Sequence, residues 1–112
     1  GYKARVNAAK INEQIAHSEV ELKRITVQSQ LQQLVQQYVK LKRTIEYFQS
    51  QALPQSELII QNSQLGFKSG DISYVQHQQN LTLALNIHKE YLDNLYQYNQ
   101  SLIFIETLLG KR

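Results

Sequence analysis

The chain has 112 residues, of which 42% are hydrophobic, so it can form one domain with a small core but not several domains. It contains no cysteine, methionine or tryptophan, which excludes disulfide scaffolds, thiolate zinc sites and thiol catalysis. The net charge of +3 comes from scattered lysine and arginine rather than from one basic face, so no nucleic-acid partner is expected.

The first predicted element is a helix that begins near residue 3. Residues 3–52 contain no proline or glycine, and they predict about 50 helical residues, or about 75 Å. Apolar residues step by three and four along the second half of this segment, which is typical of a heptad seam. These seam residues are Leu31, Leu34, Tyr38, Leu41, Ile45, Phe48 and Ala52. A looser apolar row precedes them at Ala8, Ile11, Ile15, Leu22 and Ile25.

A kink or short break is predicted at residues 52–54. Pro54 cannot donate to the helix ladder, and its ring crowds the preceding turn. Helical spacing resumes with Leu58, Ile59, Asn62 and Leu65, so the outgoing helix is expected to span about 3–65.

A chain reversal is predicted at residues 66–71, where two glycines occur within six residues. Gly66 and Gly70 are each suited to the left-handed conformation that ends a helix. Asp71 is suited to accept from the free amides at the start of the next helix.

The returning helix is expected over residues 72–109, again without proline or glycine, and Gly110 is expected to close it. Its length should be about 57 Å. Its predicted seam comprises Ala84, Ile87, Tyr91, Leu95, Tyr98 and Leu102.

Together these elements predict an all-α fold, a long antiparallel coiled-coil-like hairpin that forms a single domain over residues 1–112. Because the outgoing arm is longer, about 30 Å of it should extend beyond its partner. This overhang, roughly Ala4 to Ile25, carries apolar residues that need cover. Self-association is therefore expected for the chain alone, as a dimer that forms a four-helix bundle.

Several segments resemble the TolC-type outer-membrane efflux channels. Residues 64–75 (QLGFKSGDISYV) look like the glycine-aromatic-x-x-glycine turn of that family. Residues 91–99 and 105–110 are similar to its returning helix, and residues 3–10 and 52–54 are similar to its outgoing helix. The resemblance covers essentially the whole chain, and the sequence near residues 52–54 and 98–99 looks closest to versions associated with, or fused to, CusA/CzcA-type heavy-metal pumps.

The resemblance implies a structural segment of a periplasmic tunnel in a Gram-negative bacterium. Family members are trimers whose tunnel tip meets a periplasmic adaptor, which links the channel to an inner-membrane pump for metal ions or small molecules. The implied docking turn comprises Gly66, Phe67, Lys68, Ser69, Gly70 and Asp71. The barrel strands and the second repeat of a full channel are absent from the sequence, so the chain is expected to be one piece of an outer-membrane-associated or pump-fused protein.

No catalytic, metal or cofactor site is expected. His77 and His88 are eleven residues apart, about 16 Å along a helix, and His17 lies on the other arm. Glu57, Asp71, Asp93 and Glu106 are isolated, and the tyrosines fit packing better than a ligand cage.

Two other interpretations remain open from the residues. One is a coiled-coil interaction or scaffold protein unrelated to efflux. The other is a periplasmic adaptor hairpin, which predicts flanking lipoyl-like halves.

Overall fold

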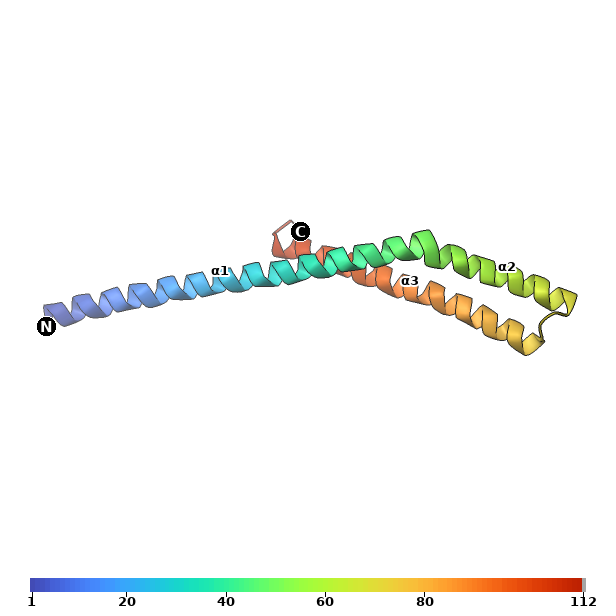
Figure 1. Ribbon diagram of the computed structural model, residues 1–112. Coiled ribbons are helices and arrows are strands. Elements are labelled where there is room, and N and C mark those ends of the chain that lie inside the picture. Colours follow the sequence, from blue (N-terminus) through green and yellow to red (C-terminus); the bar gives the residue numbers. More distant parts are fainter. Residues whose placement is uncertain (112) are drawn as a thin grey trace.

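The molecule is an elongated helical hairpin with principal extents of 98 × 24 × 19 Å (Figure 1). The computed structural model describes residues 1–111. Three segments follow one another without a break, namely α1 (Tyr2–Tyr47), η1 (Phe48–Ala52) and α2 (Leu53–Ser69). They form one outgoing helix of 68 residues, against which α3 (Tyr74–Leu108) packs antiparallel. The predicted all-α hairpin is confirmed at this level.

The outgoing helix does not break at Pro54, because one turn of π-helix absorbs the disturbance. In η1 the Leu53 N–H donates to the Phe48 carbonyl, a bond one residue longer than an α-helical one. Pro54 then occupies the first turn of α2, where a missing N–H is tolerated. The outgoing helix bends at this point (Figure 1).

The π turn inserts one extra residue into the seam. Seam positions alternate by three and four up to Ala52, and regular continuation would bury Gln55 and Asn62. The structure instead buries Ser56 and Ser63 and leaves Gln55 and Asn62 exposed. The segment with Leu58, Ile59, Asn62 and Leu65 is helical as predicted, but Leu58 and Leu65 lie on its exposed face, at 56% and 65% exposure.

The reversal is shorter than predicted, because α2 continues through Gly66 and ends at Ser69. Of the two glycines in the turn, Gly70 takes the left-handed conformation, with φ 80°, and Gly66 stays helical. The Asp71 N–H donates to the Gly66 carbonyl at 2.8 Å and the Gly70 N–H to the Phe67 carbonyl at 3.2 Å, which is a Schellman motif. Gly66 is a packing position, since a Cβ built there would lie 3.4 Å from the Ile72 side chain.

The cap of the returning helix also differs from the prediction. Ser73, not Asp71, is the N-cap, and its hydroxyl accepts from the Gln76 N–H at 3.1 Å. Asp71 instead accepts from the Ser69 hydroxyl at 3.0 Å, within the turn. At the other end Gly110 has φ 73° and closes α3 with a second Schellman motif, in which the Lys111 N–H reaches the Glu106 carbonyl.

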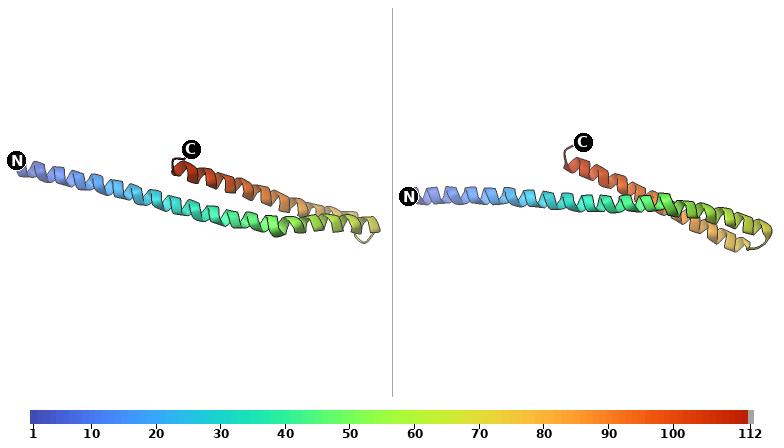
Figure 2. Two further views of the ribbon diagram at one scale, coloured as in Figure 1. Left: turned by 90° about the horizontal axis from the view of Figure 1, so that it is seen from above. Right: turned by 45° about the horizontal axis from the view of Figure 1, so that its top comes forward.

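The two arms have unequal lengths, as both views in Figure 2 show. The last residue of α3, Leu108, lies at the level of Gln30, so no helix of the described chain, residues 1–111, packs beside residues 2–29 of α1. We call residues 2–29 the overhang. Large apolar side chains along it are exposed, including Leu22 at 66%. Within residues 1–111, no helix combines the length and the apolarity that crossing a membrane requires.

Candidate functional site

The predicted seam residues lie between the two arms of the hairpin. Five of them are buried, namely Leu41, Ile45, Phe48, Ala52 and Ala84. The other eight are half-buried, and these are Leu31, Leu34, Tyr38, Ile87, Tyr91, Leu95, Tyr98 and Leu102. The hairpin therefore has its tightest packing around its middle, and burial decreases toward the open end.

Aromatic residues join the arms in this middle section. The rings of Tyr38 and Tyr98 stack with centroids 5.1 Å apart, and their hydroxyls lie 3.1 Å apart. The hydrogen bond with Tyr38, followed by burial, raises the pKa of Tyr98 above its usual value. The rings of Phe48 and Tyr91 have centroids 5.9 Å apart, and the Tyr91 hydroxyl accepts from the Gln49 side chain at 3.2 Å. These groups lock the arms together, as the packing role assigned to the tyrosines requires.

Along the outgoing helix, the buried residues are apolar up to Ala52 and small and polar beyond η1. We call residues 53–88 the distal hairpin. Ser56 and Ser63 are buried there against α3, at 0% and 3% exposure. Small residues at an interface let two helices approach closely. Apolar periodicity predicts neither serine, although their spacing of seven residues is typical of a seam.

Each buried serine pairs with one histidine of α3. The Ser56 hydroxyl donates to the Leu53 carbonyl at 2.8 Å, so it accepts from His88 Nε2, which lies 3.2 Å away. The Ser63 hydroxyl accepts from the Asn80 side chain at 3.2 Å, and it also shares a hydrogen bond with His77 Nδ1, 2.6 Å away. No buried side-chain polar atom in the described part of the chain lacks a partner.

The three histidines do not meet. His77 and His88 are held by different serines, and His17 lies on the overhang. Among residues 1–111 there is no group of three histidine or carboxylate side chains that could hold a metal ion. Each histidine of the distal hairpin thus serves as a hydrogen-bonding residue of the interface.

Within the predicted docking turn, Gly66 is half-buried and residues 67–71 are exposed. Phe67 stacks on His77 with ring centroids 5.0 Å apart and also contacts Tyr74 at 5.9 Å, yet it remains 41% exposed. Lys68 is exposed in the last turn of α2. The exposed tip therefore combines one aromatic edge with one positive charge, while Gly66 faces inward.

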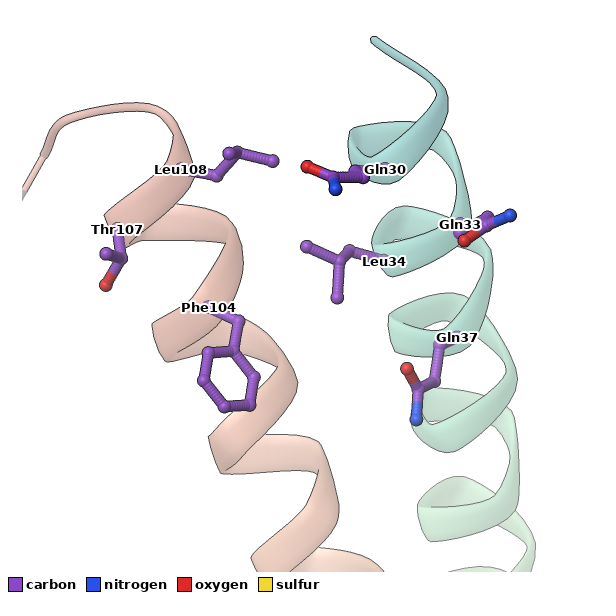
Figure 3. Close-up of a pocket in the computed structure, with 7 residues that line it drawn as sticks. All are labelled: Gln30, Gln33, Leu34, Gln37, Phe104, Thr107 and Leu108. Atoms are coloured by element: carbon purple, nitrogen blue, oxygen red, sulfur yellow. The ribbon is translucent and has the colours of Figure 1, made fainter. Parts of the chain in front are cut away.

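An apolar cavity of about 580 Å³ lies at the open end of the hairpin (Figure 3). It opens because the end of α3 diverges from α1 (Figure 2). Leu34 and Leu108 point into the space between the helices. The rest of the lining comprises Phe104, Thr107, Gln30, Gln33 and Gln37. The cavity contains no charged group, so it is suited to packing rather than to chemistry.

Comparison with known proteins gives no relative, since no family model, curated protein or solved structure matches the chain.

Proposed function

We propose that the chain is a periplasmic helical hairpin of a TolC-type outer-membrane efflux channel, where it forms part of a tunnel wall and has no catalytic role. The observation that carries this proposal is the unequal pair of arms, with a long outgoing helix and a shorter returning one. In an isolated hairpin the apolar rows of the overhang would stay exposed to water, which is unfavourable. A tunnel wall, in which neighbouring helices lie on both sides, covers such rows.

The tip supports an adaptor-docking role within the same proposal. Phe67 and Lys68 are exposed at the far end of the rod, and Leu65, Tyr74 and Val75 are exposed beside them. This mixture fits contact with the helices of a periplasmic adaptor, because an apolar centre with a polar rim is typical of protein interfaces. The adaptor would connect the channel, a homotrimer, to an inner-membrane pump that exports metal ions or small molecules.

The proposal can be tested with tip variants in the Gram-negative bacterium that carries the gene. Phe67→Ala and Lys68→Glu should raise the cellular accumulation of the exported ion or compound while the amount of protein in the envelope stays constant. Lys89→Glu is the matched control, since Lys89 is exposed on α3 away from the tip.

Adaptor contact can be measured in the same strain. The chain has no cysteine, so Lys68→Cys gives one defined attachment point for a crosslinker. A crosslink to a periplasmic adaptor is expected from Lys68→Cys and not from Lys89→Cys. A cytoplasmic location together with unchanged accumulation in the tip variants would refute the channel and favour the coiled-coil scaffold.

A further inference from the structure

The overhang carries an apolar stripe that does not continue the seam of the hairpin. We call it the overhang stripe. Its members alternate by four and three residues, and all but the serine are apolar: Ala4, Ala8, Ile11, Ile15, Ser18, Leu22 and Ile25. Traced back in steps of seven, the seam row of Leu31 passes instead through Arg24, His17 and Lys10. The second seam row, that of Leu34, passes through Val27 and Val20, so the stripe is displaced from the seam by two residues, a rotation of about 160°, and lies on another face of α1. A longer α3 would leave it uncovered.

This stripe is open to solvent along its length. Ile11, Ile15 and Ile25 are each more than half exposed, and Leu22 is 66% exposed. A shallow groove runs over the same face, lined by Ile11, Gln14, Ile15, Ser18, Glu19 and Leu22. The regular spacing of three and four is the pattern that packs against a second helix in a coiled coil.

The charges beside the stripe indicate what that second helix is. Arg5 and Glu19 are fourteen residues apart and therefore flank the stripe on the same side, two heptads from each other. If a second copy lies antiparallel with Ile11 opposite Ile15, Arg5 of each copy falls beside Glu19 of the other. The twofold symmetry makes this pair occur twice.

Other arrangements of the same stripe lack this complementarity. Moving the antiparallel register by one heptad puts Glu19 beside Asn12, and moving it by two puts Glu19 beside Glu19 of the second copy. A parallel pair would set Gln14 beside Glu19 and Glu21 beside Thr26, with no opposite charges. The register that pairs Arg5 with Glu19 also sets Ala8 opposite Ser18 and Ala4 opposite Leu22.

We infer that the overhang stripe is a self-association surface, which binds the overhang of a second copy of this chain antiparallel with Ile11 opposite Ile15. The two hairpins then point away from each other at the ends of a rod about 160 Å long. This arrangement differs from a four-helix bundle, in which the hairpins themselves would lie side by side.

The inference does not rest on the proposed function, because it uses only the stripe and its flanking charges. In a tunnel whose copies all point the same way, the stripe would face a neighbouring helix of the tunnel wall instead. The antiparallel dimer and the tunnel wall therefore cover the same surface in two different ways. The dimer forms when the chain is not part of an assembled channel.

Charge reversal tests the pairing by sedimentation equilibrium of the whole chain. Arg5→Glu and Glu19→Arg should each weaken self-association about tenfold, because each places like charges together twice in the dimer. An equimolar mixture of the two variants should recover the affinity. In the mixed dimer the two introduced side chains meet each other, and the native Arg5 of one variant meets the native Glu19 of the other.

Glu13→Arg is the matched control for these reversals. Glu13 lies on the row of Val20 and Val27, away from the stripe, so its reversal should leave the affinity unchanged.

Direction is measured separately with a spin label at Gln30→Cys, the only cysteine in that variant. The antiparallel register predicts a distance between the two labels of about 50 Å. A parallel pair would give less than about 20 Å, the separation of two packed helices. A strict monomer up to millimolar concentration, a short label distance, or equal affinities for Arg5→Glu and the unaltered chain would each overturn the inference.

Discussion

At the scale of single residues, the distal hairpin depends on two serine hydroxyls that face histidines. Ser56 and Ser63 each make two hydrogen bonds through the hydroxyl, and within residues 1–111 no buried side-chain polar atom is left unpaired. Their role could not be predicted by searching for apolar periodicity, because small polar residues are usually exposed. The histidines that bind them were predicted to be free of metal, but not to be paired with serines.

Replacing Ser56 by leucine should destabilise the hairpin by about 1–3 kcal/mol, because a larger side chain must enter an interface that has no space for it. Ser56→Ala should cost about 1 kcal/mol through the lost hydrogen bond with His88. Urea unfolding followed by circular dichroism measures both. Gln55→Leu, one residue away on the exposed face, should change stability by less than about 0.5 kcal/mol. Equal stability of the Ser56→Leu and Gln55→Leu variants would contradict the close packing at Ser56.

At the scale of elements, the sequence predicts the two arms and the position of the reversal, but not which glycine ends the helix. Gly66 and Gly70 are equally able to take positive φ. The choice depends on Ile72, which packs on Gly66 only after the chain has turned, and on Ser73, whose cap lies two residues past Asp71. Such contacts join residues on both sides of the turn and are not encoded in local spacing.

The two glycines should respond oppositely to alanine. Gly70→Ala should lower stability by about 1 kcal/mol or more, because φ 80° is strained for a residue with a Cβ. Gly66→Ala should be neutral or stabilise by up to about 0.8 kcal/mol through helix propensity, since the new Cβ meets Ile72 at ordinary contact distance. Thermal unfolding of the two variants measures the difference, and the prediction fails if Gly66→Ala is the more damaging change.

The π turn is the second feature of this scale that periodicity did not reveal. It explains why the seam moves to Ser56 and Ser63 while Leu58 and Leu65 remain exposed. Pro54 did mark the place, because the missing N–H lies within the turn that follows η1. The insertion of one residue, rather than a break, follows from packing on α3.

Deleting Gln55 together with Pro54→Ala should convert η1 into α-helix and keep the hairpin folded. The deletion restores an unbroken alternation of three and four from Leu41 through Ser63, because it removes the extra residue between Ala52 and Ser56. Amide chemical shifts would show continuous α-helix, and the midpoint of thermal unfolding should fall by only a few degrees. Deletion of Gln61, an exposed glutamine in α2, should instead misalign Ser63 with His77 and unfold the tip.

At the scale of the whole molecule, the sequence predicts the difference in arm length and the exposed apolar surface that results from it. Both follow from counting residues between helix breakers, which is the most dependable kind of sequence inference for long periodic segments. The sequence alone does not show which face of the helix this surface occupies relative to the hairpin seam. That follows from the burial of Leu41, Ile45 and Phe48, which identifies the seam rows. The divergence of α3 from α1 at the open end has no signal in the sequence.

Amide hydrogen exchange at low protein concentration should divide the outgoing helix in two. Amides of residues 2–28 should exchange fastest, because a helix without tertiary contacts is only marginally stable in water. Amides of residues 41–63 should be protected by packing on α3. At high concentration protection should appear over residues 4–25 as the overhang becomes covered, whereas uniform protection at every concentration would contradict the unpartnered overhang.

The extra residue in Phe48–Ala52 also has a consequence for protein engineering. A chimera joined inside that turn could receive a foreign tip in either of two rotational settings about 100° apart, depending on whether the additional residue is kept. A junction at this turn would leave the packing of α1 on α3 unchanged. The turn is therefore a suitable place to exchange the tip of this hairpin for the tip of another helical hairpin.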